Sequence, residues 1–496
     1  MEAYQRAISS IKGSLDGDYQ HDGVKWMLER EEDENVKGGI LADDMGLGKT
    51  MQAIATLRGN EQPTLIISIV GTVNQWRDAL IDFGGYRPLI INPSFMGILP
   101  NNVTVAITTY SSFQKTKPPP CLLSYPWKRV ILDEGHVIRN PATKLFKEIS
   151  KLQSEIRWIL SGTPIQNSKK DLKTLAGWVG VPKNEDIDAI TSKYVLRRTQ
   201  EGQSKANPKL ALPPLTTSVI KLNFESKNEL KFYNAIEDYY ASKAHTTFDA
   251  IEGLTRCRQA CTNPMLYLNG ISKKRKHMDE NECVNGPPSI KQFWKNEEIS
   301  CTKIKHLVND IIEHTKNSKC LVFCIWTNEM KLLQQELKNN KVPSMIYDGQ
   351  LSRDNKEAIL YNFKNADIPV LIIQINCGSS GLNLQCANKV YITSPHYNPC
   401  VELQAIGRAY RKGQMEPVSC VRYVMSGTIE EKCMEIQDRK MSIIVEAMKD
   451  DSLLSRLSGS MECESDLMTI FRKNGREIES GIDKSFSDLL DELLVD

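Results

Sequence analysis

The segment from Gly39 to Thr50, GILADDMGLGKT, has the residue types and the spacing of a phosphate-binding loop. A short apolar step precedes the glycines and a helical pattern follows, which predicts a strand, a tight turn and a helix N-terminus. Gly46 and Gly48 allow the backbone to turn sharply and to point N–H groups at phosphate oxygens. Lys49 supplies a cation for the terminal phosphates, and Thr50 supplies a hydroxyl for Mg²⁺. The segment therefore predicts a site for ATP and Mg²⁺.

Two carboxylates follow the apolar run 130–132, at Asp133 and Glu134. A buried parallel strand that ends there places both at the carboxyl edge of a sheet, where the phosphate loop also opens. Asp133 suits a contact to Mg²⁺, and Glu134 suits activation of the attacking water. A solvated pair of acids at a strand end is the alternative, and the phosphate loop upstream favours the catalytic interpretation.

A pair of arginines, Arg408 and Arg411, lies in the second half of the chain. Their spacing of three residues predicts that they share one face of a helix. Guanidinium groups that reach across a cleft neutralise charge on a transferred phosphoryl group, an effect worth roughly 10³ to 10⁵ in rate. Two arginines on a solvated helix face are the alternative.

Composition describes a globular chain: of 496 residues, 41% are hydrophobic and 25% are charged, with a net charge of +2. This length predicts two to four domains. No apolar run reaches the ~18 residues that cross a membrane, and no secretory leader is evident, so no membrane partner is expected. The thirteen cysteines are scattered, which indicates reduced thiols in an intracellular protein without structural zinc.

Charge is distributed unevenly along the chain. A net charge this small recruits no polyanion by itself, so nucleic acid would need a local basic stripe. The basic run 273–276 could contact phosphates or act as a nuclear import signal, although a solvated linker is the simpler interpretation. The tail 477–496 is acidic and predicts a terminal amphipathic helix that docks a partner or a basic surface.

Short apolar segments alternate with helical patterns in both halves, which predicts two doubly wound parallel sheets. The predicted strands are 64–69, 89–91, 103–108, 129–133 and 157–161, then 319–325, 344–347, 370–375, 389–392 and 418–424. We expect an N-terminal ATP-binding lobe (1–215), a helical insertion with a basic linker (216–300, exposed from 268 to 299), a C-terminal lobe (301–426), and a helical brace with an acidic tail (427–496).

Taken in order, these segments resemble the Swi/Snf-type ATPases of helicase superfamily two, from about Leu15 to about Lys473. Asp43, which stands where a strict phosphate loop has glycine, is similar to the acidic version of that family. The segments that carry the resemblance are 19–26, 43–50, 75–76, 108–110, 133–141, 196–198, 256–261, 347–349, 378–384 and 404–411. Residues 133–141 are most similar to the helicase-like transcription factor group. Residues 262–301 hold two cysteines and one histidine, too few for the RING module of that group.

The resemblance implies an α/β fold of two tandem RecA-like lobes with helical insertions and a C-terminal helical extension. It implies that ATP and Mg²⁺ lie between the lobes, with Gln20 reading adenine. The implied ATP-binding residues are Gln20, Asp44, Met45, Gly46, Leu47, Gly48, Lys49 and Thr50; Thr50 and Asp133 hold the metal, and Lys49, Glu134, Arg408 and Arg411 are catalytic. The implied DNA contacts are Trp76, Thr108, Tyr110, Ser161 and Thr163 in the first lobe, and Asn376, Ser379 and Asn383 in the second.

The implied activity is that of a DNA-dependent ATPase that translocates on double-stranded DNA and remodels or displaces a DNA-bound complex, such as a nucleosome or a polymerase. DNA bound across both lobes would favour their closure and so stimulate hydrolysis. A strand-separating helicase and a non-catalytic DNA-bound scaffold are the alternatives. The implied location is nuclear or otherwise intracellular and DNA-associated, and the near-minimal architecture suits a cellular or a viral source.

Overall fold

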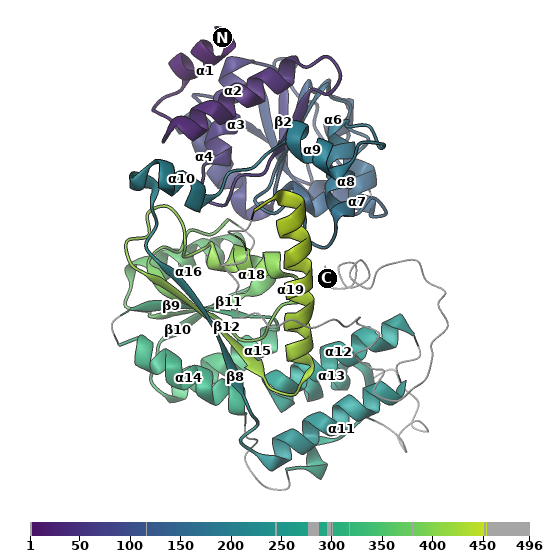
Figure 1. Cartoon of the computed structure of the whole chain (residues 1–496), viewed down its shortest axis with the longest axis vertical. Helices are drawn as coiled ribbons and strands as arrows, with labels where there is room; N and C mark the ends of the chain where they lie inside the picture. Colours follow the sequence, from purple (N-terminus) through teal and green to yellow (C-terminus); the bar gives the residue numbers. More distant parts are fainter. Residues whose placement is uncertain are drawn as a thin grey trace.

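Two parallel sheets build two α/β lobes, which lie one above the other in Figure 1. The computed structural model describes residues 2–450 and 453, apart from 116, 244–245, 276–286, 295–298, 300, 317 and 379–380. The predicted fold class is confirmed, because each lobe is a parallel sheet covered by helices. The predicted acidic tail lies outside the described residues.

Lobe one contains a sheet with the strand order β3-β4-β2-β5-β6-β1-β7, in which all neighbours are parallel. Its central strands are apolar along their length because helices cover both faces. The strands are β1 (Gly38–Leu41), β2 (Thr64–Ser68), β3 (Leu89–Ile90), β4 (Val105–Thr109), β5 (Arg129–Asp133), β6 (Ile156–Leu160) and β7 (Val195–Leu196).

The helices of lobe one are α1 (Glu2–Ser10), α2 (Asp18–Glu32), α3 (Lys49–Gly59), α4 (Val73–Asp82), α5 (Ser111–Gln114), α6 (Pro120–Ser124), α7 (Lys144–Ile149), α8 (Lys169–Val179), α9 (Ile187–Tyr194) and α10 (Gln200–Ala206). Short 3-10 turns, η1 (Val70–Thr72), η2 (Gly135–Ile138) and η3 (Pro208–Leu210), connect them. Because β1, β6 and β5 are adjacent and parallel, the loops that follow them open at one edge of the sheet.

Lobe two contains a sheet with the strand order β10-β11-β9-β12-β13-β8, again parallel throughout. The strands are β8 (Leu215–Leu222), β9 (Lys319–Cys324), β10 (Ser344–Tyr347), β11 (Val370–Gln374), β12 (Ala387–Ile392) and β13 (Val418–Met425). The helices are α14 (Thr302–His314), α15 (Thr327–Asn339), α16 (Arg353–Asn365), α17 (Ile375–Gly378), α18 (Pro399–Ile406) and α19 (Ile429–Met448).

The segment between the two predicted lobes contributes more to lobe two than we expected. Strand β8 pairs along its whole length with β13, from Leu215 opposite Val418 to Leu222 opposite Met425. The helices α11 (Lys227–Lys243), α12 (Thr247–Thr262) and α13 (Pro264–Arg275) and the turn η5 (Ile290–Gln292) then follow. The prediction of an exposed linker from 268 to 299 is wrong in part, since Ile271, Ile290 and Trp294 are buried in the apolar core of lobe two.

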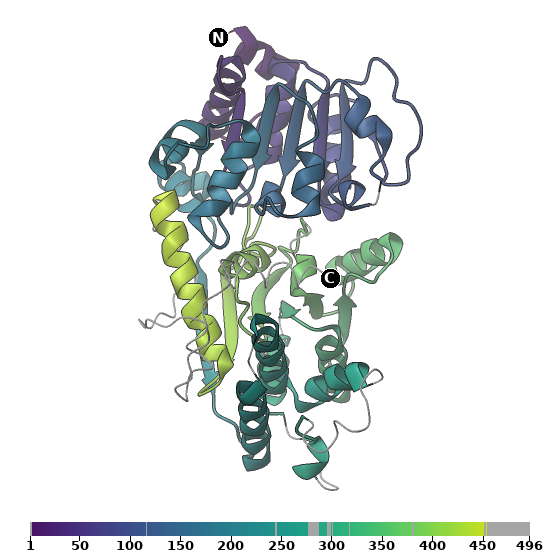
Figure 2. The same ribbon diagram turned by 90° about the vertical axis from the view of Figure 1, so that its right-hand side faces the viewer.

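Helix α19 runs beside both lobes, as Figures 1 and 2 show. It packs on α12, α18 and β13 of lobe two, and on α8 and α9 of lobe one. Polar contacts fasten its second half to lobe one: Lys440 Nζ donates to Asn167 Oδ1 at 2.7 Å, and Glu446 Oε1 lies 2.6 Å from Lys169 Nζ. Helix α19 therefore bridges the two lobes.

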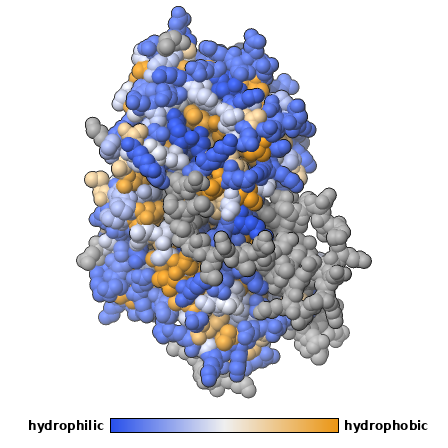
Figure 3. Space-filling view, viewed as in Figure 1, coloured by the Kyte–Doolittle hydropathy of each residue, from blue (hydrophilic) through white to orange (hydrophobic). Residues whose placement is uncertain are grey.

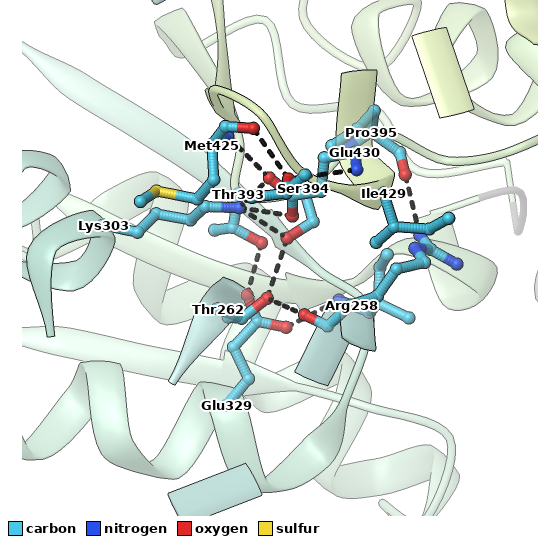
Figure 4. Close-up of polar contacts among 12 residues, drawn as sticks. Arg258, Thr262, Lys303, Glu329, Thr393, Ser394, Pro395, Met425, Ile429 and Glu430 are labelled. Carbon is cyan, nitrogen blue, oxygen red and sulfur yellow. Dashed lines mark hydrogen bonds and ion pairs between the residues drawn. The ribbon is translucent and has the colours of Figure 1, made fainter. Parts of the chain in front are cut away.

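A buried polar cluster fixes the first turn of α19 to the rest of lobe two (Figure 4). Lys303 Nζ lies 2.5 and 2.7 Å from the two carboxylate oxygens of Glu430, and both side chains are completely buried. Lys303 also donates to Ser394 Oγ at 3.1 Å, and that hydroxyl bonds Thr262 Oγ1 of α12 at 2.9 Å. One ammonium group thus joins α14, α19 and the end of β12.

The surface seen in Figure 3 is mostly hydrophilic, and its apolar side chains form small, separate groups. Within the described residues, the structure has no helix that combines the length and the apolar composition needed to cross a membrane.

Replacing Lys303 should strongly destabilise lobe two. Lys303→Met leaves Glu430 buried without its cation, a change that costs roughly 3–5 kcal/mol in proteins. Lys305→Met is the matched control, because Lys305 lies on the same helix and its pair with Glu225 (2.7 Å) is largely exposed and therefore contributes little to stability. Thermal unfolding checks this: similar melting temperatures for the two variants would contradict it.

Candidate active site

The phosphate loop lies between β1 and α3, as predicted. Gly46 and Gly48 both have positive φ, 92° and 74°, a region that favours glycine. Gly48 immediately precedes α3, and a Cβ there would collide with the side-chain amide of Gln20. The glycines are therefore required by backbone geometry and by the close approach of Gln20, and the loop presents N–H groups at a helix N-terminus.

Lys49 holds a positive charge over this loop. Its Nζ donates to the carbonyl oxygens of Asp43 at 2.7 Å and Asp44 at 3.2 Å. Burial lowers the pKa of Lys49, and the negative charge of Glu134, followed by those of other nearby carboxylates, opposes this shift. Thr50 occupies the first turn of α3 beside it. Lys49 and the N-terminus of α3 together therefore suit the binding of a phosphate anion.

Glu134 is the most constrained residue of the site. Among the described residues only Glu134, Lys341 and Lys449 have positive φ without being glycine, and Glu134 has φ 51°. Its Oε2 is buried without a hydrogen-bond partner. Burial raises the pKa of Glu134, against the opposing effects of Lys49 and Arg408. Nδ1 of His136 lies 3.4 Å from this oxygen without forming a hydrogen bond. A strained backbone and a buried carboxylate oxygen that accepts no hydrogen bond together indicate a functional group.

Asp133 ends β5 beside Glu134. Burial, and then the charge of Glu134, raise the pKa of Asp133 to about 6. Trp76 Nε1 donates to Asp133 Oδ2 at 2.8 Å, Thr72 Oγ1 approaches the same oxygen at 3.4 Å, and Tyr110 Oη donates to the backbone carbonyl of Asp133 at 2.8 Å. Among the described residues, all hydrogen bonds of this carboxylate go to Oδ2, which leaves Oδ1 for a ligand.

Arg408 of lobe two reaches the acids of this site, although not from a helix, and Arg411 lies near the phosphate loop. Helix α18 ends at Ile406, and Arg408 and Arg411 lie in the turn that follows Gly407, so the prediction of a shared helix face is wrong. Arg408 is buried, and this burial lowers the pKa of its guanidinium to about 10. The negative charges of Glu134 and then Asp133 oppose that shift. A Cβ at Gly46 would lie 3.8 Å from the Cβ of Arg411, whose Nη1 donates to the carbonyl of Leu382 in lobe two at 3.3 Å. Cationic groups of lobe two thus meet the acids and the loop of lobe one.

Gln20 is buried, and its side-chain amide is already bonded. Its Oε1 accepts from the backbone N–H of Asp16 at 2.8 Å, and its Nε2 donates to the carbonyl of Leu47 at 3.2 Å. The side chain therefore supports the phosphate loop. Its role in reading adenine stays a prediction.

The other residues predicted to bind ATP have structural contacts of their own. Leu47 is buried, Met45 packs against Gly407 of lobe two, and Asp44 is held by Arg197. Arg197 Nη2 lies 3.0 Å from Asp44 Oδ1 and 2.5 Å from Asp450 Oδ2, at the end of α19.

The sequence analysis assigned no role to Arg197 or Arg198. Arg198 Nη2 lies 2.5 Å from Asp43 Oδ2, so the acid that replaces the glycine of a strict phosphate loop is paired. The dipeptide Arg197-Arg198, after a short apolar strand, was the available signal.

The predicted DNA contacts of lobe one need correction. Trp76 is 1% exposed and binds Asp133, Thr108 is 1% exposed and bonds the carbonyl of Ile91 at 2.8 Å, and Tyr110 is 5% exposed. These three side chains pack inside lobe one and are not available to a DNA backbone. A hydroxyl or an aromatic ring at a strand end has the same sequence pattern whether it points inward or outward.

Ser161 and Thr163 lie at the boundary between the lobes. Ser161 Oγ is 3.0 Å from Nδ1 of His136, whose pKa burial lowers to about 3, so this imidazole is neutral at physiological pH. Thr163 Oγ1 lies 3.5 Å from Gln404 Nε2 of lobe two. In lobe two, Asn376 and Asn383 are exposed, and Ser379 lies outside the described residues. Ser161 is 0% exposed, so its side chain is no more available to a DNA backbone than those of Trp76, Thr108 and Tyr110, and that predicted contact also needs correction. DNA contacts by Thr163, Asn376, Ser379 and Asn383 stay predictions.

The residues at this edge fit Mg²⁺. The available ligands are all oxygen atoms, namely the hydroxyl of Thr50 and Oδ1 of Asp133, and Mg²⁺ prefers oxygen ligands with several retained waters or phosphates. A divalent cation beside Asp133 would also offset the charge of the acid pair.

Glu134→Gln should raise the melting temperature of the nucleotide-free protein at neutral pH. The upward pKa shift means that folding disfavours the ionised carboxylate, so removing its charge should raise the free energy of unfolding and therefore Tm. The gain should shrink as the pH falls through the carboxyl range, because Glu134 is then protonated in both states. Calorimetry beside Glu29→Gln, an exposed control, checks this; a Tm lower than that of the control would contradict it.

Each lobe contains a segment that matches a known protein domain. The SNF2-related domain matches residues 19–186, and the helicase conserved C-terminal domain matches residues 302–413. The "Probable global transactivator" of Orgyia pseudotsugata multicapsid polyhedrosis virus is 29% identical over 470 residues, covering 86% of this chain and 90% of the relative. The human "SWI/SNF-related matrix-associated actin-dependent regulator of chromatin subfamily A member 1" is 26% identical, covering 94% of this chain and 47% of the relative.

The chain spans about half to three-fifths of the length of several cellular relatives that it matches. Among solved structures, the "Sulfolobus solfataricus SWI2/SNF2 ATPase core in complex with dsDNA" is 23% identical, covers 90% of this chain and 96% of that chain, and gives a TM-score of 0.39. The chain thus combines an SNF2-related domain with a helicase conserved C-terminal domain, and this combination supports a helicase-like, DNA-dependent ATPase.

Proposed function

We propose that this protein is an ATP-dependent translocase on double-stranded DNA, which couples hydrolysis to the remodelling or displacement of DNA-bound protein complexes. The observation that carries the proposal is the burial of Arg408 of lobe two beside Glu134 and Asp133 of lobe one. A site built from both lobes hydrolyses ATP only in one arrangement of the lobes. A ligand that favours that arrangement, such as DNA bound across both lobes, therefore stimulates hydrolysis.

Each residue has a distinct role in this scheme. Lys49 binds the terminal phosphates, and Thr50 and Asp133 hold Mg²⁺, which neutralises and aligns those phosphates. Glu134 accepts the proton of the attacking water, for which its unpaired Oε2 is placed. Arg408 and Arg411 neutralise charge that develops on the transferred phosphoryl group.

Movement along DNA follows from cycles of closing and opening. The lobes meet through polar side chains, such as Asn398 Nδ2 bonded to Gln166 Oε1 at 2.7 Å, and through an apolar cluster that includes residues of both lobes. Relative motion is the usual behaviour of lobes joined by a partly polar interface. Backbone contacts would make binding weakly sequence-specific and sensitive to salt. The names of the viral and human relatives, a transactivator and a chromatin regulator, support a target such as a nucleosome or a polymerase, in the nucleus or another DNA-containing compartment.

Removing the charge of Arg408 should abolish turnover while the protein still binds ATP. Arg408→Ala leaves the phosphate loop intact but takes away the cation that lobe two contributes, so DNA-stimulated hydrolysis should fall by about 10³ or more. Arg87→Ala, an exposed arginine of lobe one, is the control. Phosphate release and nucleotide binding are measured on the same samples. Hydrolysis by Arg408→Ala within a few-fold of the control would contradict the proposed role.

Translocation should be visible without strand separation. The protein with ATP should displace a triplex-forming strand from duplex DNA, whereas Lys49→Ala should not, because it lacks the cation for the terminal phosphates. A forked duplex measured in parallel tests the helicase alternative. Unwinding of the fork without triplex displacement would favour strand separation, and activity in neither assay with normal DNA binding would favour a scaffold.

A further inference from the structure

We propose that helix α4 relays the position of lobe two to Asp133, and that Trp76 is the positioning residue that aims this carboxylate. The inference deepens the proposed function and rests on it in one respect, namely that Asp133 acts on Mg²⁺ with bound ATP.

Two side chains of the η1–α4 segment contact the carboxylate of Asp133. Thr72 and Trp76 are four residues apart, and their side chains reach the same oxygen, Oδ2, at 3.4 and 2.8 Å. Trp76 is 1% exposed and belongs to the apolar core of lobe one, so its indole is held by packing as well as by the hydrogen bond. A ligand oxygen fixed in this way keeps one orientation, with Oδ1 presented to the site.

The start of the same helix contacts lobe two. Gln75 Nε2 donates to the backbone carbonyl of Gly381 at 2.7 Å, and Asn74 Oδ1 accepts from Arg353 Nη2 of α16 at 2.5 Å. Asn74 Nδ2 also donates to Glu357 Oε1, one helical turn further along α16, at 3.2 Å. The first turn of α4 is thus bonded to two separate segments of lobe two.

Thr72 belongs to both contacts. Its Oγ1 approaches Asp133, while its methyl group lies so close to Gly381 that a Cβ at that position would overlap it. Gly381 has φ +70°, so glycine is also favoured there by the backbone. Lobe two therefore contacts Thr72, which lies four residues before Trp76. When lobe two withdraws, the segment that holds Asp133 loses this contact.

The energetic consequence follows from the chemistry of metal ligands. A residue that orients a ligand through a hydrogen bond typically changes metal affinity or activity by about 10–100-fold when it is removed. Loss of the Trp76 donor should therefore weaken the contribution of Mg²⁺ to nucleotide binding rather than nucleotide binding itself. Loss of the lobe-two contact should weaken the response to DNA.

The first experiment measures this contribution directly. Affinity for a non-hydrolysable ATP analogue is determined by calorimetry with Mg²⁺ and with EDTA, for the wild type, Trp76→Phe and Trp127→Phe. Trp127 is the matched control, because it is equally buried and its indole donates to a carbonyl, that of Leu122 at 3.0 Å, away from Asp133. Trp76→Phe should lose about tenfold or more of the affinity in Mg²⁺ and almost none in EDTA, and Trp127→Phe should resemble the wild type.

One result would overturn the positioning role, namely a ratio of the Mg²⁺ and EDTA affinities in Trp76→Phe that equals the wild-type ratio. No loss in either condition gives that ratio, and so does an equal loss in both conditions, which is what a general packing defect produces. If the wild type itself gains nothing from Mg²⁺, the proposed nucleotide site fails, so the two failures are distinguishable.

The second experiment tests the relay. Gln75→Ala removes the bond to Gly381, and Arg77→Ala removes a side chain of the same helix that pairs with Asp78 within lobe one. Gln75→Ala should lose several-fold more of the DNA-stimulated rate than of the DNA-free rate, whereas Arg77→Ala should keep their ratio. Equal stimulation by DNA in the two variants would contradict the relay.

Discussion

The candidate active site depends on the balance of charge around two adjacent, half-buried carboxylates. Asp133 and Glu134 lie side by side at the end of β5, and burial raises the pKa of both. The compensating cations come from different parts of the chain, Lys49 from the phosphate loop of lobe one and Arg408 from lobe two. Because charge at a dry site is expensive unless it is paired, the state of the acids is tied to the position of lobe two.

The rest of the molecule controls that position through polar contacts that lie beside an apolar cluster shared by both lobes. Helix α19 is anchored in lobe two by the buried pair of Lys303 and Glu430, and it reaches lobe one through Lys440 and Asp450. On the other side of the interface, Gln75 meets Gly381. Polar interfaces of this kind hold a defined geometry and still separate, which a cycle of closing and opening requires.

Much of the fold could be predicted from the sequence, because parallel strands buried on both faces appear as short runs of apolar residues. Strands β5 and β10 have the predicted ends, and the other predicted strands differ by one or two residues. Strands β7 and β8 were missed: β7 is only two residues long, and β8 alternates exposed and half-buried residues before pairing with a strand some 200 positions away. Such distant pairing leaves no local signal.

The roles within the site were harder to predict than its location. The loop, the acid pair and the arginines could be found from motif spacing, but burial decided the rest. Trp76 and Tyr110 are residue types that often contact nucleic acids, yet both side chains point into lobe one and donate hydrogen bonds to Asp133. Gly407 ends α18 before Arg408, so the arginines approach the site from a turn, an outcome that a three-residue spacing cannot distinguish from a helix face.

The most direct test follows lobe closure and hydrolysis in one sample. Dyes at residue 29 of α2 and residue 361 of α16, two exposed positions on different lobes, report the distance between the lobes by single-molecule energy transfer. Duplex DNA is titrated at saturating ATP while phosphate release is recorded. The account predicts that the hydrolysis rate rises in proportion to the fraction of closed molecules. A rate that rises while the closed fraction stays constant, or a closed fraction that rises without hydrolysis, would contradict it.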